Sequence, residues 1–118
     1  MARGRILAKR VYAPSSRADG TRVLVMRLWP RGIRKSRVDV WLRELGPVIE
    51  LLRAFRSGKV DWAEYRRRYR AGLRRPEARA HIAEVRRLAR SGTVTLLCGC
   101  PDEQRCHRTL LRDYLAKV

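Results

Sequence analysis

Three cysteines, a histidine and an arginine near the C-terminal end are the residues best suited to chemistry. Cys98, Cys100 and Cys106 fall within nine residues, and His107 and Arg108 follow directly. The chain has no other cysteine, so a scattered disulfide framework is excluded. A thiol beside an imidazole can act as a nucleophile that is activated by a base, so Cys106 or Cys98 with His107 is a candidate catalytic unit.

The same cluster has two further interpretations. Cysteine and histidine are zinc ligands, but the spacing Cys98-x-Cys100-x5-Cys106-His107 matches none of the usual patterns built on C-x2-C pairs. A disulfide between Cys100 and Cys106 requires a disulfide-tolerant cell such as that of a thermophile. We therefore expect neither a metal nor another cofactor, and the redox state of the three cysteines stays open.

A second group of residues favours binding of an anion. Arg27 alternates with apolar neighbours in a segment that reads as a buried strand, and a guanidinium is almost never buried without an anionic partner. Acidic residues are few, so the expected partner is an exogenous phosphate or sulfate, with Arg31 as a second contact. Free N–H groups at the start of a helix near His107 and Arg108 also favour an anion.

Together these features predict a pocket for a phosphate-bearing or other small anionic ligand at the carboxyl ends of the strands. The expected ligand-binding residues are Arg10, Tyr12, Arg27, Trp29, Arg31, Gly32 and Arg108, with His107 beside them. The alternative is a thiol-dependent enzyme that acts on a phosphorylated or nucleotide-like substrate. Whether the protein is an enzyme, and its oligomeric state, stay open at this point.

The charge of the chain supports a third hypothesis. It has 29 Lys+Arg against 11 Asp+Glu, a formal net charge of +18, and an acidic partner would relieve the resulting self-repulsion. Sequence-independent nucleic-acid binding would use one Arg-rich helix, although a solvated helix face is an equally simple interpretation. We expect its two tyrosines to pack in the core. The segment contains Tyr65, Arg66, Arg67, Arg68, Tyr69, Arg70, Arg74 and Arg75.

Composition limits the class of protein. The 118 residues are 45% hydrophobic, which predicts one α/β domain over residues 1–118 with a modest core. No apolar run approaches the roughly 18 to 20 residues of a membrane span, so we expect no membrane partner and a cytoplasmic location. The excess of Arg over Lys and the absence of Asn indicate either a GC-rich genome or adaptation to heat.

The elements that must position these residues follow from hydrophobic spacing and helix caps. Strands are predicted at 5–12, 22–29 and 93–98, and helices at 36–45, 47–56, 61–73, 76–90 and 106–118. This order predicts an α/β fold with a small three-stranded sheet, mixed or parallel, flanked by about five helices. The short loop 13–20 favours an antiparallel first pair, although strand directions stay open. A single pocket requires that strands 22–29 and 93–98 be neighbours, or that both adjoin the first strand.

The chain contains the strings Lys9-Arg10-Val11-Tyr12, Asp19-Gly20-x-Arg22-Val23-Leu24-Val25, Arg27-Leu28-Trp29-Pro30-Arg31-Gly32, Trp41, Tyr69, Leu97-Cys98 and Cys106-His107-Arg108. These strings resemble those of the YeaO-like proteins of the domain of unknown function 488 (DUF488) family. The resemblance spans nearly the whole chain and implies a compact, cytosolic α/β domain with no settled activity. Two acidic residues common in the family are replaced here by Met26 and Cys100, and the Ser of a Pro-Ser pair by Val48. His107 or a thiol would therefore have to perform any acid–base step.

Overall fold

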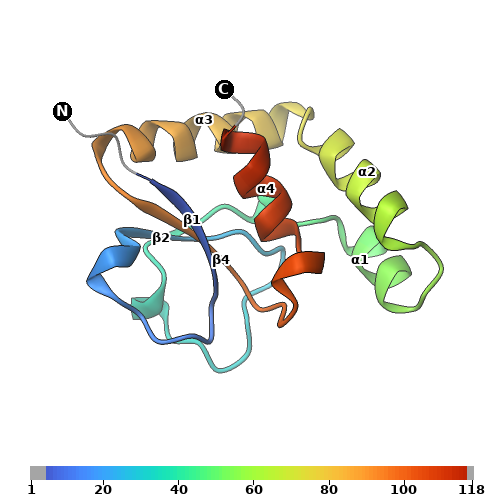
Figure 1. Ribbon diagram of the computed structural model, residues 1–118, viewed down its shortest axis with the longest axis horizontal. Coiled ribbons are helices and arrows are strands. Elements are labelled where there is room, and N and C mark those ends of the chain that lie inside the picture. Colours follow the sequence, from blue (N-terminus) through green and yellow to red (C-terminus); the bar gives the residue numbers. More distant parts are fainter. Residues whose placement is uncertain (1–4, 117–118) are drawn as a thin grey trace.

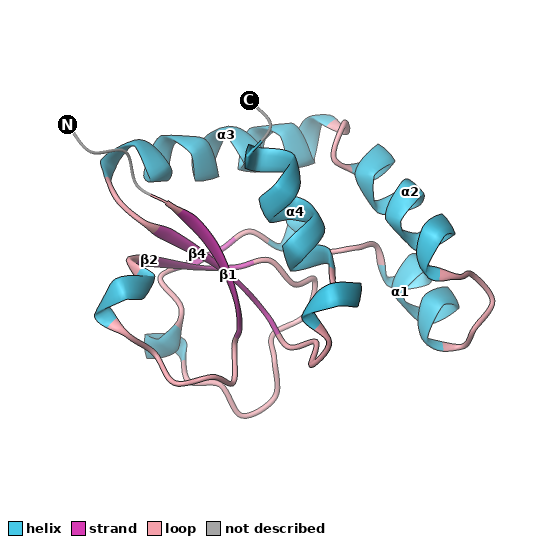
Figure 2. Cartoon of the chain, viewed as in Figure 1, coloured by secondary structure: helices cyan, strands magenta, loops and turns pink. Residues whose placement is uncertain are grey.

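A four-stranded parallel sheet with four α-helices makes up the part of the chain that the computed structural model describes, residues 5–116 (Figures 1 and 2). The strands are β1 (Ile6–Arg10), β2 (Thr21–Leu24), β3 (Val40–Trp41) and β4 (Val94–Cys98). The helices are α1 (Ile49–Arg56), α2 (Trp62–Gly72), α3 (Pro76–Ser91) and α4 (His107–Ala116). Short 3-10 turns occur at Arg17–Asp19, Lys35–Arg37, Arg43–Leu45 and Glu103–Arg105. The α/β class is as predicted, with one strand more and one helix fewer than expected.

The sheet has the order β1-β4-β2-β3, and every pair is parallel. Every residue of β4 is buried, as expected for a strand that is covered on both faces. Residue Leu96 of this strand pairs with Ala8 on one side and with Val23 on the other. The two strands that carry the halves of the predicted pocket are therefore neighbours, as a single pocket requires.

The antiparallel first pair is wrong, because β4 lies between β1 and β2. Residues 11–20 return the chain across β4, and they contain a 3-10 turn that Ser16 caps. Ten residues can span about 33 Å. That is enough for the return along a strand of about 16 Å and across two strand spacings of about 5 Å each. A crossover of this length therefore needs no helix.

The helix predicted at 36–45 is also wrong. The segment forms two 3-10 turns with β3 between them, and Val40 and Trp41 pair with the edge of β2. The apolar residues of this segment have the spacing of one helix face, but they pack on two different faces of the sheet. Val38 and Trp41 pack on one face of the sheet, whereas Leu42 and Leu45 join the core on the other. Pairing with the sheet overrides the helical pattern.

Two apolar clusters lie on the opposite faces of the sheet, as strand alternation requires. The larger joins all four helices to the face that carries Val23, Val25 and Leu96. The smaller contains Leu24 and Leu97 and is covered by loop residues. Among the described residues, no helix is long and apolar enough to cross a bilayer.

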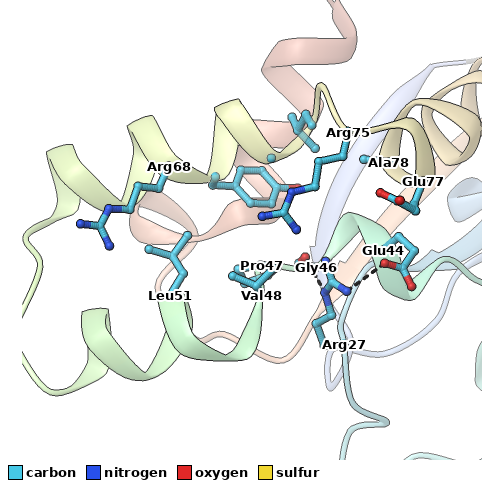
Figure 3. Close-up of a pocket in the computed structure, with 13 residues that line it drawn as sticks. Arg27, Glu44, Gly46, Pro47, Val48, Leu51, Arg68, Arg75, Glu77 and Ala78 are labelled. Atoms are coloured by element: carbon cyan, nitrogen blue, oxygen red, sulfur yellow. Dashed lines mark hydrogen bonds and ion pairs between the residues drawn. The ribbon is translucent and has the colours of Figure 1, made fainter.

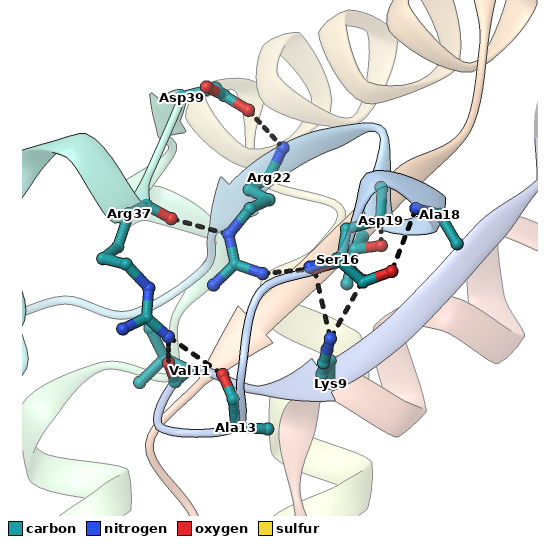
Figure 4. A network of polar contacts seen from close by, with 10 residues as sticks. Lys9, Val11, Ala13, Ser16, Ala18, Asp19, Arg22, Arg37 and Asp39 are labelled. Atoms are coloured by element: carbon teal, nitrogen blue, oxygen red, sulfur yellow. Dashed lines mark hydrogen bonds and ion pairs between the residues drawn. The ribbon is translucent and has the colours of Figure 1, made fainter.

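The face opposite the helices also holds a buried polar network centred on Asp19 (Figure 4). Its carboxylate accepts from Lys9 Nζ at 3.0 Å, from the N–H of Ser16 at 3.0 Å and from the guanidinium of Arg22. Arg22 also donates to the carbonyl of Arg37 at 2.7 Å. The network ties β1, β2 and the crossover into one unit.

Candidate functional site

A cavity of about 590 Å³ opens where β1, β2 and β4 end. Carboxyl ends of parallel strands are the usual ligand-binding edge of an open α/β sheet. Apolar and aromatic side chains dominate the lining, which includes four arginines and, among the described residues, no carboxylate. The loop after β2, helix α1 and the loop after β4 contribute most of it. We call this space the ligand cavity.

Two thiols and one imidazole meet at the inner wall of the ligand cavity. Cys98 ends β4, and Cys106 and His107 begin the unit that leads into α4, so a strand and a helix terminus fix their positions. The Sγ atoms of Cys98 and Cys106 are 3.4 Å apart. His107 Nδ1 is 3.7 Å from Cys98 Sγ and 3.9 Å from Cys106 Sγ. All three side chains are buried, and we refer to them as the thiol–imidazole cluster.

The tautomer of His107 follows from its other contact. Its Nε2 lies within hydrogen-bond distance of the Val25 carbonyl oxygen. Because a carbonyl only accepts, Nε2 carries a proton, and in the neutral ring Nδ1 then presents its lone pair to the two sulfurs. The ring also packs edgewise against Tyr69, with centroids 5.6 Å apart. The sequence placed His107 beside the cysteines but gave no sign of this orientation.

The environment shifts the pKa values of Cys98 and Cys100 in opposite directions. A hydrogen bond from the Cys106 thiol, helped by the N–H of Cys100 and opposed by burial, holds the pKa of Cys98 below its ordinary value. A hydrogen bond to Cys106, together with burial, raises the pKa of Cys100. All three thiols are free, so the disulfide between Cys100 and Cys106 is not formed.

Arg108 lies behind the cluster and does not line the ligand cavity. Its side chain is buried, and it donates to the carbonyl of Cys100 at 2.7 Å and to Cys106 Sγ at 3.3 Å. Among the side chains that the structure describes, its Nε has no hydrogen-bond partner and its guanidinium forms no ion pair with a carboxylate. The carbonyl of Cys100 and the sulfur of Cys106 are therefore the acceptors that this buried cation reaches.

Arg27 has a different environment from the one predicted. It follows β2 rather than lying inside a strand, and it donates to Glu44 at 2.9 Å and to the carbonyl of Gly46 at 3.1 Å (Figure 3). Its side chain is 23% exposed, so the exogenous anion that we inferred from a buried guanidinium is replaced by an internal carboxylate. We did not predict Glu44 as the partner of Arg27, because residues 36–45 were expected to form a helix.

Of the remaining predicted residues, three line the cavity and two do not. Tyr12, Trp29 and Arg31 line it, and the Tyr12 hydroxyl donates to the Arg31 carbonyl at 2.9 Å. Arg10 lies just outside, with its guanidinium 5.1 Å from the centroid of the Tyr12 ring. Gly32 does not line the cavity. Sequence reasoning missed several lining residues. The packing of α1 and α2 brings in Ile49, Leu52, Phe55, Arg56 and Tyr65, and the loops after β2 and β4 add Leu28 and Arg105.

Both tyrosines of the Arg-rich helix α2 are buried, whereas Trp62 at its start is partly exposed. Tyr65 and Tyr69 are 2% and 4% exposed, so both pack in the core as predicted. Glu64 pairs with Arg67 at 2.7 Å and with Arg68 at 2.6 Å. This helix therefore offers charge to a polyanion, but neither of its tyrosines is available for a base to stack on.

Comparisons with known proteins place the chain in a family. Residues 6–118 match the family model DUF488-N3a, described as the active DUF488-N3 subclade. The chain is 38% identical over 116 residues to the uncharacterised protein YeaO of Escherichia coli, with 96% of this chain and 98% of that protein covered. An uncharacterised protein of Mycobacterium tuberculosis is 34% identical over 113 residues, which cover 94% of this chain and 93% of the relative. No solved structure matches the chain. The chain therefore belongs to the DUF488 family and is a YeaO-like member of it.

Proposed function

We propose that the protein binds a small organic anion, with an apolar or aromatic body, in the ligand cavity. The observation that carries the proposal is the composition of the lining, which combines apolar side chains with four arginines and no carboxylate among the described residues. A cavity of about 590 Å³ lies within the range of roughly 300 to 1,000 Å³ that small-molecule sites occupy.

Three of the four arginines are available to an anion. Arg27 is neutralised by Glu44, whereas Arg31, Arg56 and Arg105 form no ion pair within the described residues. Their side chains are exposed, so they can move toward a phosphate or carboxylate at the mouth of the cavity. A planar guanidinium suits such groups because it can donate two parallel hydrogen bonds.

The apolar part of the ligand has a matching surface. Tyr12 and Leu28 are 43% and 67% exposed and are the exposed large hydrophobic residues among those that the structure describes. Both line the cavity, and a ligand that covers them would remove apolar surface from water. Farther in, Phe55 and Tyr65 lie with ring centroids 4.6 Å apart, which offers an aromatic wall to a flat ligand.

Calorimetric titration with phenyl phosphate tests this proposal. We expect phenyl phosphate to bind more tightly than either inorganic phosphate, which lacks the apolar body, or phenol, which lacks the charge. Arg56→Ala and Arg105→Ala should each weaken binding by about three- to tenfold, as expected for charge-assisted contacts at a solvent-exposed rim.

Arg79→Ala is the matched control. Arg79 is exposed on α3 and does not line the cavity, so this variant removes the same charge at a distant place. If all three variants weaken binding equally, the attraction comes from the net charge of the protein and the proposal is wrong. Equal binding of phenyl phosphate and inorganic phosphate would also contradict it.

A further inference from the structure

We propose that Cys98, Cys106 and His107 form a binding site for one thiophilic metal ion of the zinc class, with an open coordination position toward the ligand cavity. Among the described residues they are a group whose ligand atoms, two Sγ and one imidazole nitrogen, all lie within 4.8 Å of one another. Thiolate and imidazole are the donors that Zn²⁺ prefers. The inference goes beyond binding of an organic anion and does not depend on it.

The distances within the thiol–imidazole cluster match those of a tetrahedral centre. With zinc–sulfur bonds of about 2.3 Å and zinc–nitrogen bonds of about 2.0 Å, tetrahedral geometry separates two sulfurs by about 3.8 Å and sulfur from nitrogen by about 3.5 Å. The corresponding separations here are 3.4 Å between the sulfurs and 3.7 and 3.9 Å from the sulfurs to Nδ1. Side-chain shifts of a few tenths of an ångström would give all three bonds.

The orientation of His107 is that of a metal ligand. A histidine that binds a metal through one ring nitrogen donates its other N–H to a carbonyl or carboxylate, which fixes the tautomer. Nε2 of His107 donates to the Val25 carbonyl in this way. Among the described residues, the polar contacts of Nδ1 are with the two sulfurs, at distances too long for strong hydrogen bonds. Simple packing in the core would not require this deprotonated nitrogen to face two thiols.

The buried charge around the cluster is consistent with a metal and an anion together. Two thiolates balance a divalent ion, which leaves the buried guanidinium of Arg108 as one positive charge in excess. Arg108 donates to Cys106 Sγ at 3.3 Å and has no carboxylate partner among the described residues. An anionic fourth ligand, such as hydroxide or the acidic group of a molecule in the cavity, would restore neutrality.

The fourth position faces the ligand cavity because all three ligand residues line it. Cys100 also lines the cavity, but its Sγ lies outside the group and is 3.6 Å from the Asp102 carbonyl oxygen. Three protein ligands and one open position are typical of catalytic zinc, whereas structural sites are closed by four. The C-x2-C pattern that the sequence lacks belongs to those closed sites.

Cobalt and zinc titration of the reduced, chelator-treated full-length chain tests the proposal in the absence of any organic anion. We expect one equivalent of Co²⁺ to produce thiolate-to-cobalt charge-transfer absorption and the intense visible bands of a tetrahedral ion, and we expect Zn²⁺ to abolish both. Zinc should also raise the Tm of the protein, because binding to the native state stabilises it. Cys98→Ser and His107→Gln should lower zinc affinity by more than the roughly 10- to 100-fold that loss of an outer contact costs.

Cys100→Ser is the matched control, because it removes a thiol from the same loop and should retain both the bands and the affinity. The wild-type chain decides the question even if a variant fails to fold. Folded, reduced wild-type protein that takes up neither metal would overturn the proposal, as would loss of binding in Cys100→Ser equal to that in Cys98→Ser. Failure to bind phenyl phosphate would contradict the proposed function alone, since metal uptake is measured without it.

Discussion

Asp19 is the centre of the buried charge on the sheet face opposite the helices. The residue is 5% exposed. Burial would raise its pKa, but hydrogen bonds from Lys9, the N–H of Ser16 and Arg22 outweigh burial and lower the pKa below the ordinary 3.8. A carboxyl group whose pKa is lower in the folded state than in the unfolded chain stabilises the fold at every pH above the unfolded value. That contribution is lost as the pH falls through the folded pKa.

We therefore expect Asp19→Asn to lower the free energy of unfolding at neutral pH by about 3 kcal/mol, because it leaves a buried guanidinium without its counter-charge. The stability of the wild type should fall from below about pH 4, and the difference between wild type and variant should shrink with it. Denaturant unfolding at several pH values measures both. Asp113→Asn, which removes an exposed carboxylate, should have little effect, and a constant difference between pH 7 and pH 2 would contradict this account.

The candidate site was predictable where residue type alone determines position. Cys98 ends an apolar run, and His107 follows the turn before a helix, so their meeting at one sheet edge could be inferred from the sequence. The ion pair of Arg27 with Glu44 could not be inferred from the sequence. It forms only because residues 36–45, which have helical spacing, fold into β3 and its flanking 3-10 turns instead. Arg56 was equally hidden, since its place at the cavity depends on how α1 packs.

The helices with strong end signals were predicted, and the edge strand was not. Asp61 accepts from the N–H of Glu64 at 2.8 Å at the start of α2, and Pro76 opens α3, as their residue types predicted. Strand β3 has only two residues, and pairing with β2 rather than its own propensity creates it. The end of β2 was placed too late because apolar residues continue to Trp29 after the sheet pairing has ended.

Gly46 supports the loop after β2 through close backbone contact. A Cβ at this position would lie 2.6 Å from the N atom of Arg27 and 2.9 Å from the carbonyl carbon of Met26. We expect Gly46→Ala to push this loop outward, to destabilise the fold by about 1–3 kcal/mol, and to weaken phenyl phosphate binding. Thermal unfolding and calorimetry measure the two effects.

Gly72→Ala is the matched control for that experiment. Gly72 is the last residue of α2, and a Cβ there would meet nothing within 4 Å. Alanine at that position should leave the stability unchanged or raise it by up to about 1 kcal/mol. Equal effects of the two substitutions would show that the loop after β2 tolerates a side chain at Gly46.

The net charge of +18 acts over the whole surface rather than at one site. We expect the protein to bind a short DNA duplex at low salt through its exposed arginines and to lose that binding at physiological salt, since counterion release drives it. Fluorescence anisotropy over a salt series measures the slope. Arg66→Ala and Arg79→Ala, on different helices, should weaken binding alike. Affinity that persists at physiological salt and depends on α2 alone would instead indicate a dedicated nucleic-acid surface.

The position of β4 at the centre of the sheet has a consequence for how the protein is made. Strands β1 and β2 each pair with β4, yet β4 begins only at Val94, late in a chain of 118 residues. During translation β1 and β2 cannot pair with β4 while α1, α2 and α3 are being synthesised. The sheet therefore closes only once β4 has left the ribosome, and its closure creates the wall on which Cys98 meets Cys106 and His107.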